Sequence, residues 1–201
     1  MLKLYRYYTY NGINVAIKLY KVGKCHMKRK GLICVFTGNG KGKTTAALGA
    51  AFRAAGQGLK VLILQFMKKQ KNIGEIKALE CSELPIELKQ YGYRLFFKSR
   101  ACEPIDILRA TQGLAAFQQA MESNTYDLII LDEINIAIDF GLIAFEQLRE
   151  LIARKPNELH LILTGRNAPQ ELIKMADLVT EMREVKHHYN QGVQAQKGIE
   201  F

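Results

Sequence analysis

One stretch decides the fold of this 201-residue chain: Thr37-Gly38-Asn39-Gly40-Lys41-Gly42-Lys43-Thr44-Thr45. It follows a short aliphatic run at residues 32–36 and precedes residues 46–51, which are rich in alanine and typical of a helix. A strand, a glycine-rich turn and a helix start in this order are the context of a phosphate-binding loop. The glycines let backbone N–H groups close around phosphate oxygens, and the N-terminus of the helix adds partial positive charge. We therefore expect residues 38–45 to bind the phosphates of a nucleotide.

Three side chains of this loop have predicted roles in the chemistry. Lys41 and Lys43 are expected to neutralise phosphate charge, and the Thr44 hydroxyl is expected to ligate Mg²⁺. The usual spacing of such a motif puts its first glycine at position 37, where this chain has Thr37. We expect Gly38 to take over the turn.

An apolar run at residues 128–131 ends in two acids, Asp132 and Glu133. Open α/β sheets bind ligands at the carboxyl ends of their strands, so these carboxylates are expected beside the Mg²⁺ of the phosphate loop. Hydrolases of this class often use an acid or a nearby Gln to position water. Whether Glu133 positions water or binds the metal is left open by the sequence.

The rest of the chain alternates short aliphatic runs with longer amphipathic ones, which is the pattern of a parallel sheet with helices. Strands are predicted at residues 32–36, 61–66, 86–90, 128–131, 160–163 and 178–180. Several are apolar at successive positions, so helices must cover both faces of the sheet. Two buried helix stripes are predicted, one at Ile107, Ala110, Leu114, Phe117 and Met121 and the other at Phe145, Leu148, Leu151 and Ile152. The predicted fold class is α/β, with a P-loop NTPase-like (RecA-like), mostly parallel sheet covered by helices on both faces.

The net charge of +10 is concentrated at the N-terminus. Of the 29 Lys and Arg residues, eight lie in residues 1–30, which hold none of the 19 acids, so residues 31–201 carry 21 basic against 19 acidic side chains. The charge of the larger part therefore does not demand a nucleic-acid partner. We expect two regions: residues 1–30, a basic N-terminal extension that is flexible or lies upstream of a true start near Met27, and residues 31–201, one folded domain. An added element that lies over a partner's site is the alternative for the extension.

The four cysteines indicate the compartment. Cys25, Cys34, Cys81 and Cys102 are widely separated and form no C-x-x-C pair, which favours reduced thiols and a cytoplasmic protein. No uninterrupted apolar run approaches the roughly 20 residues that span a bilayer, so we expect no membrane partner. The basic N-terminal stretch is interrupted by polar residues at 9–14 and lacks the continuous apolar run of a signal peptide.

Five pieces of the chain, taken in order, resemble one family. They are Gly38-Asn39-Gly40-Lys41-Gly42-Lys43-Thr44-Thr45-Ala46-Ala47, Asp132-Glu133-Ile134, Leu163-Thr164-Gly165-Arg166, Ala176-Asp177-Leu178-Val179-Thr180-Glu181-Met182 and Gly198-Ile199-Glu200. Their order and spacing, from about Lys30 to the C-terminus, are similar to those of the P-loop corrinoid adenosyltransferases. The resemblance implies a homodimeric transferase in which a reduced Co(I) corrinoid attacks C5′ of ATP and releases triphosphate. It also implies an electron donor such as a reduced flavoprotein.

The residues are compatible with this chemistry. Co(I) is already a strong nucleophile, and the sequence offers no obvious His or Cys arranged to activate one. The leaving triphosphate needs fixed positive charge, which Lys41, Lys43 and Mg²⁺ supply. The resemblance further implies that the nucleotide lies in the loop in reversed direction, and Arg53 and Arg166 are candidates for holding it. A surface salt bridge is the equal alternative for each arginine.

For the corrinoid, the family carries Gly-Phe-x-Trp after its third strand, and the matching stretch here is Gly92-Tyr93-Arg94-Leu95-Phe96-Phe97. Tyr93 retains the first aromatic residue, whereas Leu95 stands at the second and Phe96 follows one position late. Tyr93 and Phe96 are therefore the predicted corrinoid contacts. Core packing is the alternative for Phe96 and Phe97.

Two other functions remain open on the sequence. An ATP hydrolase or kinase would use the same loop and would release ADP. A nucleotide-gated binding module with little or no turnover would use the basic N-terminal arm as its docking element. The phosphate product distinguishes all three functions.

Overall fold

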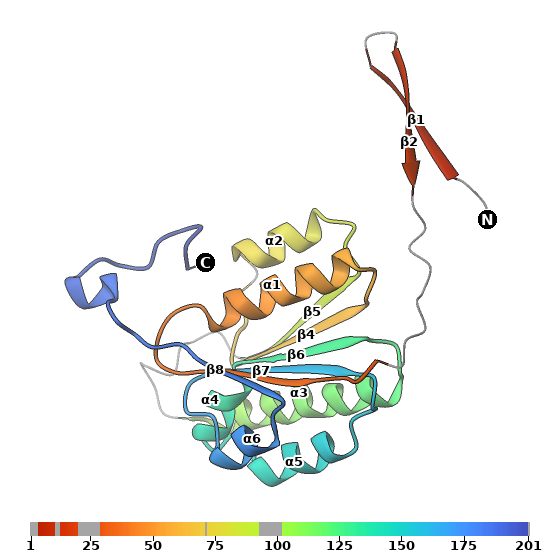
Figure 1. Ribbon diagram of the computed structural model, residues 1–201. Coiled ribbons are helices and arrows are strands. Elements are labelled where there is room, and N and C mark those ends of the chain that lie inside the picture. The colour runs from red at the N-terminus through yellow and green to blue at the C-terminus, as the bar shows by residue number, and fades with distance from the viewer. Residues whose placement is uncertain (1–3, 11–12, 20–28, 71, 93–101, 201) are drawn as a thin grey trace.

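The main body of the protein is one parallel sheet with helices on both faces (Figure 1). The structure, a computed structural model, describes residues 4–10, 13–19, 29–70, 72–92 and 102–200. The six strands of the body follow the order β5-β4-β6-β7-β3-β8, and every neighbouring pair is parallel. They are β3 (Ile33–Thr37), β4 (Val61–Phe66), β5 (Ile86–Tyr91), β6 (Leu128–Asp132), β7 (His160–Thr164) and β8 (Leu178–Glu181). All six predicted strands are confirmed, with bounds that differ by one residue at most.

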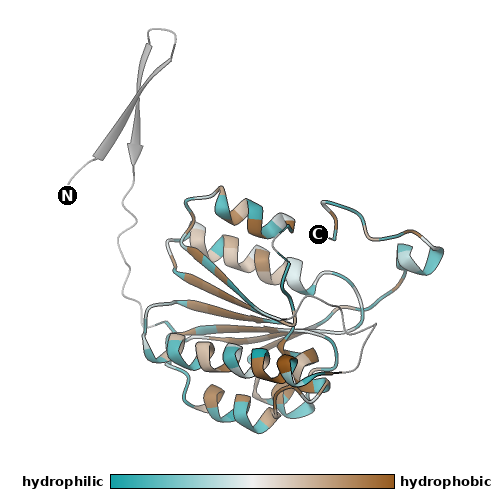
Figure 2. Cartoon of the chain, turned by 180° about the vertical axis from the view of Figure 1, so that it is seen from behind, coloured by the Kyte–Doolittle hydropathy of each residue, from teal (hydrophilic) through white to brown (hydrophobic). Residues whose placement is uncertain are grey.

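The helices divide between the two faces of the sheet, as Figures 1 and 2 show from opposite sides. On one face lie α1 (Lys43–Gly56) and α2 (Gly74–Glu80). On the other lie α3 (Pro104–Glu122), α4 (Ile134–Asp139), α5 (Phe145–Ala153) and α6 (Gln170–Met175). The predicted α/β fold with both faces covered is confirmed.

The central strands are apolar at successive positions because helices cover both faces of the sheet. In β4, Val61 and Ile63 belong to the core under α1, whereas Leu62 and Leu64 belong to the larger core on the opposite face. Side chains alternate across a strand, so a strand buried on both faces must be apolar at every position. The core under α1 includes Ala47 and Ala51, whose small side chains let that helix approach the sheet closely.

The stripe predicted on α3 is confirmed except at its first position. Ala110, Leu114, Phe117 and Met121 are buried, but Ile107 is 47% exposed. The inward position of the first helical turn is taken by Asp106, which is buried and accepts a hydrogen bond from the Glu103 backbone N–H at 3.0 Å. This contact is half of a capping box, so the need to cap the helix places a polar side chain where periodicity predicts an apolar one.

The described part of the N-terminal region is a hairpin. β1 (Leu4–Tyr10) pairs antiparallel with β2 (Ile13–Leu19), from Leu4 opposite Leu19 to Tyr10 opposite Ile13. Among the described residues, the first contacts with the main body are those of Arg29, which bonds Asp127 at 2.9 Å, and of Lys30, which bonds Asp177 at 2.8 Å. Among the described residues, no helix has the length and apolar character needed to cross a membrane.

Deletion of residues 1–26 is expected to leave the main body folded, because the first strand of its sheet and the first body contacts of the described residues come after this segment. We expect the midpoint of thermal unfolding to change by less than about 4 °C, which corresponds to roughly 1 kcal/mol for a domain of this size. Calorimetry of the full chain and of the truncated chain measures this. A larger fall would show that the extension belongs to the fold, and a loss of turnover at unchanged stability would instead place it at the active site.

Candidate functional site

The phosphate loop joins β3 to α1 at the carboxyl edge of the sheet. Gly38 has φ = 92° and Gly42 has φ = 121°, conformations that side chains with a Cβ rarely adopt. The Lys43 ammonium donates to the backbone carbonyls of Gly38 and Gly40, both at 2.7 Å, and so closes the loop around itself. The expectation that Gly38 takes over the turn in place of position 37 is confirmed.

The loop is also held from its outer side by the chain that follows β8. The Gly40 N–H donates to the Met182 carbonyl at 2.6 Å, and the Met182 N–H donates to the Thr37 carbonyl at 2.8 Å. A Cβ on Gly38 would lie 2.5 Å from the Met182 carbonyl oxygen. The glycine at this position is therefore required both by its backbone angle and by the close approach of a second backbone.

Lys43 is almost fully buried, and burial lowers the pKa of its ammonium. The Glu133 carboxylate acts in the opposite direction and raises this pKa, whereas the positive charge of Arg166 lowers it again. Among the described residues Lys43 has no direct carboxylate partner. A desolvated ammonium of this kind is well suited to an incoming phosphate, because it loses little hydration when the anion binds.

A buried carboxylate lies at the centre of the site. Asp132, at the end of β6, is 1% exposed, and its oxygens accept hydrogen bonds from four side chains. Oδ1 accepts from the Thr44 hydroxyl at 2.9 Å and from the Thr164 hydroxyl at 2.7 Å. Oδ2 accepts from the Gln65 amide at 3.1 Å and from the Lys68 ammonium at 2.8 Å. These donors come from α1, the end of β7, β4 and the segment after β4. One carboxylate is therefore hydrogen-bonded to four separate segments of the chain.

Lys68 is a site residue that the sequence analysis did not identify. Its ammonium lies 3.3 Å from the Thr44 hydroxyl oxygen and 3.9 Å from Oε1 of Glu133, besides its contact with Asp132. Burial acts to lower the pKa of this ammonium, but the carboxylates of Asp132 and Glu133 outweigh it, so the pKa of Lys68 is raised. Lys68 therefore stays charged, and it balances part of the negative charge at the end of β6.

Glu133 has an unusual environment. Its φ of 63° places it in the left-handed region, where a residue with a side chain costs of order 1 kcal/mol. Burial raises the pKa of its carboxyl group, which Lys68 partly offsets. Its Oε2 atom is buried and has no hydrogen-bond partner among the described residues. A buried carboxylate oxygen without a partner is an available hard oxygen ligand of the kind that Mg²⁺ prefers.

A cavity of about 500 Å³ opens over the loop. Its wall includes the loop from Asn39 to Thr45, Lys68 and Glu133, together with Arg166 from the segment after β7. The C-terminal segment closes the remaining side with His187, Gly198, Ile199 and Glu200. The motif at 198–200, near the end of the chain, is thus brought to the motif at 38–45.

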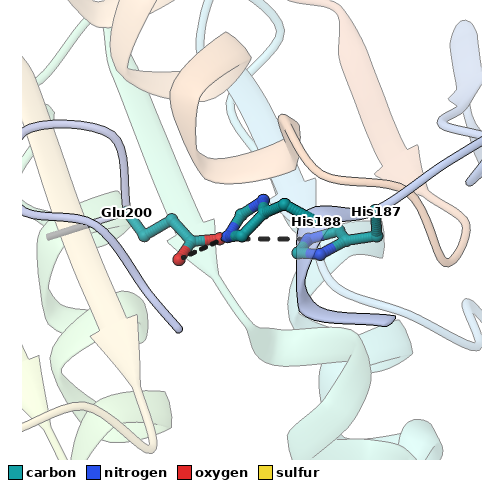
Figure 3. Close-up of side chains that lie close together, drawn as sticks. All are labelled: His187, His188 and Glu200. Carbon is teal, nitrogen blue, oxygen red and sulfur yellow. Dashed lines mark ion pairs between the residues drawn. The ribbon is translucent and has the colours of Figure 1, made fainter. Parts of the chain in front are cut away.

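Two histidines and a glutamate form a cluster at this wall (Figure 3). Nε2 of His188 lies 3.4 Å and Nε2 of His187 lies 3.9 Å from oxygens of Glu200, and the two rings stack at 4.6 Å. Nδ1 of His187 accepts a hydrogen bond from the Tyr189 N–H, so in the neutral ring the proton is on Nε2, facing Glu200. In that tautomer His187 offers no lone pair toward Glu200. Nε2 of His188 is buried and has no hydrogen-bond partner among the described residues.

The remaining predicted residues divide into three groups. Asn39, Lys41, Thr45 and Arg166 line the cavity, and Lys41 lies 3.9 Å from Glu200. Arg53 is exposed in the last turn of α1, about ten residues and so roughly 15 Å along the helix from Lys43, and does not line this cavity. Tyr93 and Phe96 lie outside the described residues.

The comparisons with known proteins agree in one family. Residues 29–201 match the model of the family described as "ATP:corrinoid adenosyltransferase BtuR/CobO/CobP". The chain is 33% identical over 172 residues to the corrinoid adenosyltransferase of Escherichia coli (strain K12), covering 86% of each chain. It is 37% identical over 181 residues to that of a Sinorhizobium species, covering 86% of this chain and 81% of the relative. It is 32% identical over 174 residues to the corrinoid adenosyltransferase CobA of Salmonella typhimurium, covering 87% of each.

Substitution Gly38→Ala is expected to destabilise the protein by roughly 1–3 kcal/mol and to weaken ATP binding, because it strains the backbone and brings a Cβ against the Met182 carbonyl. The matched control is Gly49→Ala, since Gly49 lies within α1 and a Cβ there meets nothing within 4 Å. The control is expected to stabilise the helix by about 0.5–1 kcal/mol. Urea unfolding and ATP titration measure both effects, and equal stability of the two variants would contradict the geometry of the loop.

Proposed function

Because the chain belongs to the ATP:corrinoid adenosyltransferase family, we propose that the cavity over the phosphate loop is where it holds ATP for this reaction. The activity is transfer of the adenosyl group of ATP to a corrinoid. The observation that carries the proposed placement is the meeting of the 38–45 loop, Arg166 and the 198–200 motif around one cavity. Segments that resemble the family but lie far apart in sequence thereby share one site.

The bonds that form and break in this reaction determine which groups the cavity must provide. The electron pair of Co(I) forms a bond to C5′ of ATP, the C5′–O bond breaks, and its electrons leave with the triphosphate. Because the leaving group gains negative charge, the protein must supply positive charge and hydrogen-bond donors around it. Lys43, Lys41, Arg166 and the N-terminus of α1 all face this cavity and supply them.

Membership of the adenosyltransferase family favours carbon over phosphorus as the reacting centre. Hydrolysis requires a group that positions or deprotonates water near the γ-phosphate. Nε2 of His187 is directed at Glu200, and the Glu133 carboxylate, whose Oε2 has no hydrogen-bond partner among the described residues, is the group that we assign to the divalent cation. A reversed triphosphate in the loop, with C5′ toward the open side of the cavity, is the orientation we propose.

We assign a divalent cation, Mg²⁺, to the hydroxyl of Thr44 and the carboxylates of Asp132 and Glu133. When bound it would neutralise charge on the triphosphate. The Thr44 hydroxyl donates a hydrogen bond to Asp132, so its oxygen lone pairs point away from Asp132, and one of them accepts from the Lys68 ammonium at 3.3 Å. The buried and unpartnered Oε2 of Glu133 supports this assignment.

The partners of the reaction are also part of the proposal. Co(I) must be generated by reduction, and the site residues described above include no redox group, so a separate donor such as a reduced flavoprotein is required. The family resemblance also implies a homodimer. The free thiols Cys34, Cys81 and Cys102 are consistent with a reducing, cytoplasmic setting.

Incubation with ATP, Mg²⁺ and reduced corrinoid is expected to yield intact triphosphate and a light-sensitive Co–C bond in equal amounts. Phosphorus NMR identifies the phosphate product, and the corrinoid absorption spectrum follows the new bond. The control is Lys43→Ala, in which both products should disappear together. ADP formed without corrinoid at rates of order 1 per second, with no triphosphate, would show an ordinary hydrolase.

Substitution Tyr93→Ala is expected to reduce turnover while ATP affinity stays within about twofold, because the family resemblance assigns this aromatic residue to the corrinoid and not to the nucleotide. Steady-state kinetics with each substrate varied and ATP titration of the free protein separate the two effects. An equal loss of ATP affinity would show instead that Tyr93 supports the fold.

A further inference from the structure

The ammonium of Lys68 lies among the oxygens that we assign to the divalent cation. It is 2.8 Å from Oδ2 of Asp132 and 3.3 Å from Oγ1 of Thr44, with Oε1 of Glu133 at 3.9 Å. Three oxygens of the assigned metal site therefore surround one cation of the protein itself. An ammonium and a metal ion cannot share this space, because both need the same lone pairs and repel each other.

We propose that Lys68 is a positioning residue that occupies the divalent-cation position in the nucleotide-free protein and is displaced when the metal–nucleotide complex binds. This inference rests on the metal site of the proposed function. Lys68 keeps Thr44 and the two acids in place before the substrate arrives. It also excludes a free divalent ion, which would otherwise bind to two uncompensated carboxylates.

The contacts of Lys68 are those of a replaceable cation. Asp132 keeps Gln65 and Thr164 as donors if the ammonium leaves, so its burial does not depend on Lys68 alone. The negative charge of Glu133 is compensated only weakly, because the Lys68 ammonium stays 3.9 Å from its carboxylate and Oε2 has no partner among the described residues. A divalent cation has twice the charge and can take oxygens from both acids, so it compensates the site more fully than the ammonium does.

The backbone is arranged to bring Lys68 to this position and to let it move. The preceding residue, Met67, has φ = 58°, a left-handed conformation that turns the chain at the end of β4. The Lys68 side chain is 27% exposed and lines the cavity, so it has open space on the side of the incoming nucleotide. Once displaced, the ammonium faces the triphosphate and adds a further positive charge to the cradle.

The test is the binding of Mn²⁺, a spectroscopic substitute for Mg²⁺, to the full chain without ATP or corrinoid. Electron paramagnetic resonance measures free Mn²⁺ during titration. Lys68→Met is expected to bind Mn²⁺ about tenfold or more tightly than the wild type, because removing the ammonium leaves buried carboxylates uncompensated. Lys69→Met is the matched control, since Lys69 is the next residue and is exposed, and it should bind as the wild type does.

Two further variants complete the design. Lys68→Gln retains a hydrogen-bond donor without the charge and should also bind Mn²⁺ more tightly, which provides the same measurement if Lys68→Met does not fold. Adding Asp132→Asn to either variant should abolish the gain, which assigns it to this site. Unchanged or weaker Mn²⁺ binding in the folded Lys68 variants would overturn the proposal. Since no product is measured, this failure is distinct from a failure to detect triphosphate.

Discussion

The burial of the Asp132 carboxylate is the constraint on which the site depends. A carboxylate that is 1% exposed is stable only when its lone pairs are filled by donors, because an unpaired buried charge is costly. The four donors come from α1, β4, the segment after β4 and the end of β7, so the carboxyl edges of three adjacent strands and the start of a helix must meet at one point. The strand order, with β6 between β4 and β7, makes this meeting possible.

The sequence predicts the fold well because the pattern of this sheet is local. Each strand that is buried on both faces is a short aliphatic run, and the glycine-rich loop between residues 37 and 45 marks where β3 ends and α1 begins. The periodicity of α3 fails only at Ile107, where capping of the helix places Asp106 inward. Boundaries set by hydrophobicity are therefore predictable, whereas a boundary set by one hydrogen bond is not.

The site was predicted less completely, because its remaining members meet only through the fold. Thr44 and Asp132 have recognisable local contexts, a loop and a strand end. Gln65 interrupts an apolar strand at its carboxyl end and in hindsight carries a signal, since a polar residue in a fully buried strand needs a partner. Lys68 has no such signal: it is one of two adjacent lysines, and only the left-handed turn at Met67 selects it over Lys69.

The C-terminal segment brings a second carboxylate, that of Glu200, to the cavity. It leaves β8, binds the loop backbone through Met182 and returns to the cavity, where Glu200 meets His188 and Lys41. Glu200 thus faces the cation that we assign to the triphosphate, as Asp132 faces Lys68. In both places a carboxylate of the protein holds a positive side chain that the substrate needs. On the function proposed above, binding of the metal–nucleotide complex replaces the Lys68–Asp132 pair by contacts between the metal and the carboxylates, so the buried Asp132 stays compensated while Lys68 turns to the triphosphate.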